Sequence, residues 1–572
     1  MCLSSSCFTS SLRTSMTAFA SPSTPPKHVL LALLSLFILI LLPVSTILAH
    51  SIYQQGQWHF VSLFRQLVDS YTLNVLWNSI QLALLVTLVA TLLAAPLAWI
   101  TAKTSMGKHK WLDIVVLIPF MTPPFIDSMG WMIFMRPRGY LEQLLPSLAG
   151  FQSGFFSLAG MVLIMSLSLF PFMYLVIKNS LLRINASVEE AAVIYGATPL
   201  YSLTKVTLPL VLSGYVMGAL LVFVKTISEF GTPATLGKQI GYYVLTTEIH
   251  RFTSTWPIDF AKAATLSLVL LTVSMLMWMA QLHISNRYQY QLISGKGNKS
   301  RLITLGRWQQ VLCWLIIGAV LFLSIGIPYF SITATALLDL AGLGLSWSNL
   351  TLKHFASVFD VDGAAFSALT NSVKLSFYAA TLCAVLGIWY GLIIVKGRTK
   401  LSKVIDFSSL LSNTVPGIVV VFGLILFWNS PLNPAPVYNT SAMLVLTYVV
   451  LFLPYTVQYV KSAAEQISSS LEDAARVGGA SDWFQLTKVT LPLIFPGVLA
   501  GWTMSFIIGQ RELVGSLMVK PPGVDTTATF IFSEFDQGNT SLAMAMALVV
   551  VSVTVAILSL LKVIETRYIK KV

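Results

Sequence analysis

Residues 203–210 read LTKVTLPL, and residues 486–493 read LTKVTLPL again, 283 positions further along a chain of 572 residues. The sequence around this phrase aligns at the same offset. Examples are Pro171 with Pro454, Gly196 with Gly479, Pro209 with Pro492 and Gly214 with Gly497. An internal repeat of this length predicts that the chain contains two copies of one structural unit.

The repeat continues upstream at a slightly larger offset. At 293 positions, Asn78-Ser79 aligns with Asn371-Ser372, Asp113 with Asp406, and Pro123 with Pro416. The difference of ten residues falls between two apolar segments, in a predicted loop, where insertions are tolerated best.

The composition is that of a membrane protein. Apolar residues make up 56% of the chain and charged residues 10%, against roughly 25% charged in soluble proteins. The net charge of +13 would suggest nucleic acid binding in a soluble protein, but the basic residues lie in short clusters between apolar runs. That distribution favours the positive-inside rule instead. The four cysteines (Cys2, Cys7, Cys313 and Cys383) lack metal-site spacing and predict no disulfide framework.

Twelve apolar windows reach the length of about 20 residues that a spanning helix needs. They lie near 29–49, 79–101, 112–134, 157–178, 207–230, 262–284, 310–332, 372–395, 407–428, 440–461, 490–510 and 542–563. Because six spans is an even number, both copies enter the membrane in the same direction. The predicted fold class is therefore an all-α polytopic membrane protein with about twelve transmembrane helices in two parallel six-helix repeats.

These windows divide the chain into four parts. We expect a disordered cytoplasmic tail at 1–27, a first repeat at 28–284, a cytoplasmic linker at 285–307 and a second repeat at 308–572. The tail is rich in Ser and Thr, and a transit peptide is the alternative interpretation. The linker contains SGKGNKS, which does not match the phosphate-loop pattern.

The distribution of Lys and Arg predicts the orientation. Basic residues cluster after spans two, six, eight and twelve, whereas three loops of the opposite side are nearly free of them: 50–77 has Arg65, 333–369 has Lys353 and 429–439 has none. Both termini and the two loops that precede LTKVTLPL are therefore expected on the cytoplasmic side. The clusters are Lys103, Lys108 and Lys110; Arg287, Lys296, Lys299, Arg301 and Arg307; Lys396, Arg398, Lys400 and Lys403; and Arg567, Lys570 and Lys571.

The two repeated loops, at about 183–209 and 466–492, each predict a short helix. SVEEAAVIYG and SLEDAARVGG begin with Ser, a plausible N-cap, and carry acids in the first turn, which complement the helix dipole. Gly196 and Gly479 are expected to end these helices in a left-handed conformation. The small alanines favour docking onto another protein. The alternative is an ordinary loop with capped helices.

These loops resemble the signature of binding-protein-dependent ABC import permeases: EAA, three residues, Gly, nine residues, a β-branched residue, one residue and then LP. The first copy carries Glu189, Glu190, Ala191, Ala192, Gly196 and Pro209, and the second carries Glu472, Asp473, Ala474, Ala475, Gly479 and Pro492. Asp473 departs from the usual Glu but keeps its charge. The resemblance covers nearly all of residues 28–572.

The resemblance implies a type I ABC importer permease of the bacterial cytoplasmic (inner) membrane that works by alternating access. In that family the EAA loop docks onto an ATP-binding subunit, so the chain looks like a fused pair of permeases with two such subunits and a periplasmic or extracellular substrate-binding protein as partners. ATP and Mg would be bound by the partner subunits, and no catalytic residue or nucleic acid is expected on this chain.

Two repeated features predict a translocation path. PFMTPPF, with Pro123, interrupts the third span, and SNTVPG, with Asn413 and Pro416, interrupts its partner. Such interruptions leave backbone groups that a cavity or a neighbouring helix must satisfy, although a plain helix kink is an equal alternative. Asp127 follows the first interruption and is a weaker candidate for the path.

Glu229 and Glu512 align at the offset of 283, and each lies 20 residues beyond its LP, near the outer membrane face. A pseudo-twofold axis would bring the two carboxylates toward one another, with Lys225 and Arg511 as candidate partners. A structural salt bridge at an external gate is the alternative.

These segments look most like those of ferric iron permeases, and a hard cation such as Fe³⁺ suits carboxylate oxygens. Thiamine, polyamine and aminoalkylphosphonate importers have similar permeases and stay open. A different class, the secondary transporter with six plus six spans, would have no reason for a repeated EAA loop.

Overall fold

The structure, a computed structural model, describes residues 27–54, 57–287, 302–397, 400–430, 433 and 437–569. The predicted tail up to residue 26 and the linker between 288 and 301 lie outside these ranges. Within them, ten helices are long and apolar enough to cross a membrane, and two further segments are pairs of helices bent at a short break. These twelve segments coincide with the twelve predicted windows, and the all-α fold class is confirmed.

The first repeat contains the helices up to α16. They are α1 (Lys27–Leu36), α2 (Leu42–Ile52), α3 (Phe60–Leu67), α4 (Ser70–Lys103), α5 (Trp111–Val116), α6 (Ile118–Met121), α7 (Pro124–Met135), α8 (Tyr140–Leu144), α9 (Phe151–Phe155), α10 (Leu158–Arg183), α11 (Ala186–Ile194), α12 (Pro199–Ser202), α13 (Leu208–Ile227), α14 (Lys238–Ile240), α15 (Leu245–Ser254) and α16 (Phe260–Arg287). A two-stranded antiparallel hairpin, β1 (Tyr53–Gln54) and β2 (Gln57–Trp58), follows α2.

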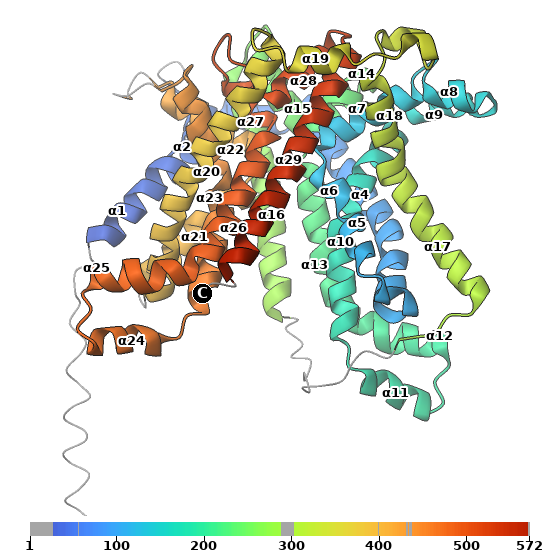
Figure 1. The fold of residues 1–572 in the computed structure, drawn as a ribbon. Helices are drawn as coiled ribbons and strands as arrows, with labels where there is room; N and C mark the ends of the chain where they lie inside the picture. The colour runs from blue at the N-terminus through green and yellow to red at the C-terminus, as the bar shows by residue number, and fades with distance from the viewer. Residues whose placement is uncertain are drawn as a thin grey trace, which may run out of the picture.

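The second repeat follows the same order. Its helices are α17 (Arg307–Leu321), α18 (Ile327–Ala336), α19 (Lys353–Val358), α20 (Ala364–Lys396), α21 (Lys400–Thr414), α22 (Gly417–Trp428), α23 (Ser441–Glu465), α24 (Ser469–Val477), α25 (Asp482–Phe484), α26 (Leu491–Gln510), α27 (Val514–Val519), α28 (Thr527–Asp536) and α29 (Thr540–Ile569). The ten extra residues of the first repeat fall in the region of α8 and α9, which extend sideways from the bundle in Figure 1.

The first span of each repeat packs on the other repeat. Helix α2 lies against α22, and α18 lies against α7 (Figure 1). Two glycines at equivalent positions of the repeats, Gly130 and Gly423, permit these close helix contacts. A Cβ added at Gly130 would lie 3.0 Å from the carbonyl oxygen of Pro328, and a Cβ at Gly423 would lie 2.5 Å from that of Pro43. The two repeats therefore exchange their first spans, and each copy completes the packing of the other.

A π-helical turn precedes an entering proline in several of these helices. One lies at Phe37–Leu41 before Pro43 and another at Phe322–Gly326 before Pro328. Because proline has no N–H and its ring collides with the carbonyl four residues earlier, a widened turn relieves both problems without ending the helix.

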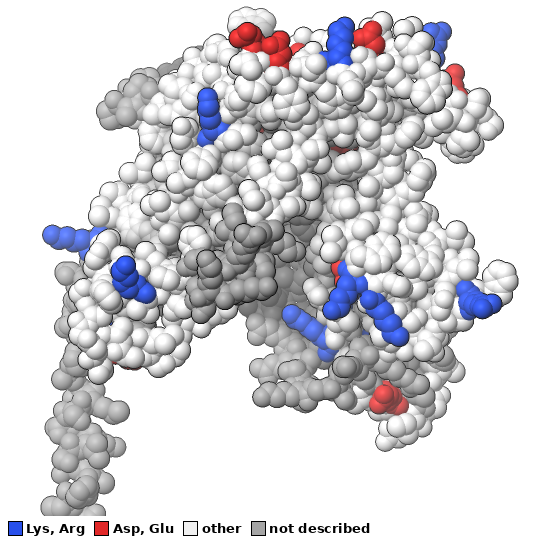
Figure 2. All heavy atoms as spheres, in the orientation of Figure 1, with Lys and Arg blue, Asp and Glu red and all other residues white. Residues whose placement is uncertain are grey.

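The bundle has two chemically different ends. We call the end that carries α11 and α24 the loop end; these helices lie at the bottom of Figure 1, apart from each other. Helices α15, α19 and α28 lie at the opposite end. On the face drawn in Figure 2, Lys and Arg side chains predominate at the loop end, acidic and basic side chains lie together at the opposite end, and a nearly uncharged band separates the two ends.

Candidate functional site

The EAA loops fold as two matching short helices. Helix α11 begins after Asn185, whose side-chain oxygen accepts a hydrogen bond from the Ser187 amide at 3.2 Å. Helix α24 begins after Ser468, whose hydroxyl accepts from the Ser470 amide at 3.3 Å. Asn185 and Ser468 align at the offset of 283. The predicted serine caps are therefore wrong by two residues: the capping residues precede them, and Ser187 and Ser470 lie inside the helices.

Both helices end as predicted, at a glycine in the left-handed conformation. Gly196 has a φ of +82° and Gly479 a φ of +80°. The amide of Ala197 donates to the carbonyl of Ala192, and that of Ala480 to the carbonyl of Ala475, which is the hydrogen bond of a Schellman motif. Nothing lies within 4 Å of a Cβ built on either glycine. The requirement for glycine is therefore conformational, not a matter of space.

The ends of these helices expose apolar side chains. Ile194, Tyr195 and Val477 are 81%, 90% and 90% exposed, and Glu190, Ala191, Asp473 and Ala474 are exposed beside them. Such an exposure of large apolar groups next to small residues and one acid is typical of a protein-binding surface. The side chains of Glu189 and Glu472 lie outside the description.

The repeated phrase LTKVTLPL forms the same local structure twice. Leu203–Thr207 and Gln485–Thr490 are π-helical, and Pro209 and Pro492 occupy the first turn of the α-helices that follow. Each phrase continues directly into α13 or α26. The widened turn and the proline thus join α12 or α25, the short helix that follows the Gly196 or Gly479 turn, to the next span as one helical segment.

The two interrupted spans are sharply broken. The halves Trp111–Met121 and Pro124–Met135 meet at 88°, and Lys400–Thr414 and Gly417–Trp428 meet at 106°. Pro123 and Pro416 occupy the break in the same extended conformation. These angles far exceed a kink in a continuous helix, so the kink alternative does not describe the geometry. Asn413 is exposed in the last turn of α21.

Arg511 occupies the break of the other repeat. Its Nη1 donates to the carbonyl oxygens of Phe120 at 3.1 Å and of Met121 at 2.8 Å. Because Pro123 and Pro124 have no N–H, the backbone at the break lacks the donors that a continuous helix would supply. Arg511, which belongs to the second repeat, supplies hydrogen-bond donors to these carbonyl oxygens of the first repeat. The residue that aligns with Arg511 in the first repeat is Ser228, so the first repeat has no guanidinium at the equivalent position.

Asp127 is buried just beyond this break. The side chain is 2% exposed, and its Oδ2 accepts a hydrogen bond from the Ser168 hydroxyl at 3.1 Å. Its Oδ1 has no hydrogen-bond partner among the described residues. The aligned residue of the second repeat is Val420, so this charge is also one-sided. Within the described part of the chain, no group of three His, Cys, Asp or Glu side chains is arranged to hold a metal ion.

Glu229 and Glu512 cap their own loops. Glu229 accepts hydrogen bonds from the amides of Gly231 at 2.6 Å and Thr232 at 3.1 Å, and Glu512 accepts from the amide of Gly515 at 3.0 Å. In the part of the chain that is described, neither carboxylate forms an ion pair with Lys225 or Arg511, and no hydrogen bond joins the two. The expected charge partners are therefore replaced by backbone amides, because a carboxylate stabilises the free N–H groups where a helix begins.

Sequence reasoning aligned Asn78-Ser79 with Asn371-Ser372 but gave them no role. The Ser79 hydroxyl accepts the Leu245 amide at 2.8 Å, and the Ser372 hydroxyl accepts the Thr527 amide at 2.7 Å. Asn78 and Asn371 donate to the carbonyls of Tyr243 and Asp525. Each pair thus holds the first residues of α15 or α28, the short helix that follows the Glu229 or Glu512 loop. Their aligned position was the signal for a shared role.

Helix α15 has a second attachment in the first repeat. The carboxylate of Glu248 is fully buried and pairs with Arg251 at 2.5 Å, and this contact raises the pKa of the Arg251 guanidinium above its ordinary value. Tyr71 of α4 donates a hydrogen bond to the same carboxylate.

The sequence profile of one protein family, described as "Binding-protein-dependent transport system inner membrane component", matches this chain twice, at residues 94–290 and 384–570. The chain is 26% identical over 485 residues to a putative ferric transport system permease protein of Haemophilus influenzae, covering 83% of this chain and 74% of the relative. It is 24% identical over 535 residues to a ferric transport system permease protein of Actinobacillus pleuropneumoniae, covering 91% and 75%.

A shorter relative is a putative 2-aminoethylphosphonate transport system permease protein of Salmonella typhimurium, 30% identical over 231 residues, which covers 39% of this chain and 83% of the relative. The two family matches together take up more than half of the chain and lie in the two repeats. The chain is thus a multi-pass membrane protein that belongs to the family of inner-membrane components of binding-protein-dependent transport systems and carries two copies of the family's unit.

Proposed function

We propose that this chain is the permease of an ATP-driven importer of ferric iron and that its two repeats together form the translocation path. The choice of ferric iron as the substrate rests on one observation. The relatives named as ferric transport permeases align with 83% and 91% of the chain, so the likeness includes both repeats and not a single unit.

The EAA loops are proposed to lie in the cytoplasm together with both termini. Each would dock one copy of an ATP-binding subunit, and a periplasmic or extracellular binding protein would deliver the substrate at the opposite end. ATP and Mg would be bound and hydrolysed by the partner subunits, and this chain would have no ATPase site of its own. The exposed apolar ends of α11 and α24 and the basic clusters of the loop end support this orientation.

Alternating access is the proposed mechanism. Closure of the ATP-binding subunits would move α11 and α24, and α13 and α26 would transmit that movement because each docking loop continues into a span. The path is proposed to run along the breaks at Pro123 and Pro416, past Asn413, Arg511, Lys225 and Asp127. Glu229 and Glu512 would shape the outer gate by holding its loops. The oxygen atoms of Asp127 suit a hard cation.

A 2-aminoethylphosphonate substrate is the second proposal, because the relative of that name has the higher identity, 30%, though over 39% of the chain. Thiamine and polyamine are further substrates of importers with similar permeases. The family match in both halves argues against a secondary transporter.

Uptake of ⁵⁵Fe³⁺, supplied as citrate, tests the proposal in cells with and without the chain. We expect the chain to be required for uptake, and excess thiamine, spermidine or 2-aminoethylphosphonate to leave uptake unchanged. Competition by one of these compounds would favour that compound as the substrate, and undiminished uptake without the chain would contradict the assignment of ferric iron. An ATP-binding subunit should co-purify with the tagged chain. ATP-independent uptake that an uncoupler abolishes would contradict the ATP-driven mechanism.

A further inference from the structure

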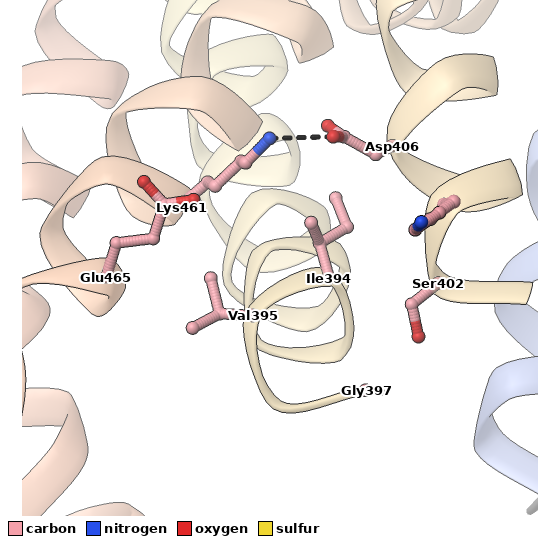
Figure 3. A pocket seen from close by; sticks show the side chains of 8 residues that line it. Ile394, Val395, Gly397, Ser402, Asp406, Lys461 and Glu465 are labelled. Atoms are coloured by element: carbon pink, nitrogen blue, oxygen red, sulfur yellow. Dashed lines mark hydrogen bonds and ion pairs between the residues drawn. The ribbon is translucent and has the colours of Figure 1, made fainter. Parts of the chain in front are cut away.

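The loop end of each repeat contains the same ion pair. Asp113 of α5 pairs with Lys178 of α10, and Asp406 of α21 pairs with Lys461 of α23 at 2.7 Å. The aspartates align at the offset of 293 and the lysines at 283. Figure 3 shows Lys461 and Asp406 reaching toward each other from two helices across a pocket at this end.

Both pairs are partly removed from solvent and both have a second donor. The side chains of Lys178 and Lys461 are 11% and 22% exposed. The Tyr174 hydroxyl donates to Asp113 at 2.6 Å, whereas Gln458 donates to Asp406 at 3.4 Å from a position that does not align with Tyr174. The surroundings have thus changed between the copies while the ion pair has stayed the same.

The position of the pairs suggests what they do. Lys178 lies in the last two turns of α10, which ends at Arg183 and leads to α11 after two residues. Lys461 lies in the last turns of α23, which ends at Glu465 and leads to α24 after three residues. The aspartates belong to the loop-end half of each broken segment. Each pair therefore joins the span that enters an EAA helix to the segment that contains a break.

We propose that the Asp113–Lys178 and Asp406–Lys461 pairs act as positioning residues that transmit movement of the EAA helices to the broken segments. The inference rests on the proposed function, because it assumes that ATP-binding subunits move α11 and α24. A partly desolvated ion pair suits this task, since the attraction between its charges is less screened than at the surface. Each ion pair therefore resists the separation of two helices that are not adjacent in the sequence.

Thiol labelling at the break tests the inference without reference to the substrate. In the complex purified through this chain, the four native cysteines are replaced by serine and Asn413→Cys reports on the break. The labelling rate is measured without nucleotide and after trapping with ATP and vanadate. We expect trapping to change the labelling rate in the parent. Lys461→Met should reduce that change by about fivefold or more. The rate of ATP hydrolysis by the Lys461→Met complex should stay within about twofold of the parent rate.

Two matched variants separate transmission from general stability. Lys461→Arg keeps the charge and should keep the response. Lys238→Met breaks an exposed ion pair with Asp536 at the opposite end and should also keep it. A full response in Lys461→Met, or an equal loss in Lys461→Met and Lys461→Arg, would overturn the inference. Failure of the proposed function would be seen separately, as absence of ⁵⁵Fe³⁺ uptake by the unmodified chain.

Discussion

At the scale of single residues, the helix-ending glycines of the EAA loops make a clear prediction. Because their φ angles are +82° and +80°, alanine at Gly196 or Gly479 should cost about 1 kcal/mol of local stability. A Cβ at either glycine meets nothing within 4 Å, so the cost is confined to the backbone. We expect Gly196→Ala and Gly479→Ala to lower ⁵⁵Fe³⁺ uptake and recovery of the ATP-binding subunit, with normal abundance in the membrane.

Gly150→Ala is the matched control for these variants. Gly150 also has nothing within 4 Å of a built Cβ, but its φ of −59° suits any residue. Uptake equal to that of Gly150→Ala in both loop variants would show that the left-handed turn is not needed for docking.

Arg511 supports a second prediction at this scale. Its removal deprives the part-buried carbonyl of Phe120 and the more exposed carbonyl of Met121 of their donor, and a hydrogen bond from a charged group contributes about 1.5–3 kcal/mol. Arg511→Met should therefore unfold at a clearly lower temperature in detergent, measured by tryptophan fluorescence. Lys353→Met, which breaks an exposed ion pair with Asp339, should change stability by less than about 0.5 kcal/mol. Equal unfolding temperatures for the two variants would contradict the role given to Arg511.

At the scale of elements, the sequence predicted what depends on local composition and missed what depends on tertiary contacts. The twelve apolar segments and the two glycine-ended helices were predictable because apolar length and backbone conformation are local properties. The capping function of Glu229 and Glu512 was missed, because their alignment shows that the residues are equivalent but not which atoms they contact. The breaks were predictable from proline, but Arg511 as the donor for one of them was not.

The outer helices α15 and α28 give a prediction for elements. Ser79 and Ser372 each accept a backbone amide at the start of one of these helices. Alanine removes the acceptor from a buried N–H, which costs about 1–3 kcal/mol. Ser79→Ala should speed hydrogen exchange in residues 245–254, and Ser372→Ala in residues 527–536, as measured by mass spectrometry. Each variant is the control for the other, and faster exchange in both segments in either variant would show a global effect.

At the scale of the whole molecule, the exchange of first spans explains how one chain can hold two repeats in register. Helix α2 completes the surface of α22, and α18 completes that of α7. Among the described residues, the broken segment of each repeat packs on the first span of the other repeat. The two halves should therefore need each other even when the linker is cut, and the linker mainly raises their local concentration.

This dependence can be measured by expressing residues 1–292 and 293–572 as separate chains. We expect the two halves to co-purify and to restore ⁵⁵Fe³⁺ uptake. Gly423→Ala should weaken their association, because its Cβ would lie 2.5 Å from the carbonyl oxygen of Pro43, and overpacking of this kind costs about 1–3 kcal/mol. Gly417→Ala, on the same helix, meets only a side-chain atom at 3.7 Å and should leave association unchanged. Halves that purify separately, or equal recovery with both variants, would contradict the exchange of first spans.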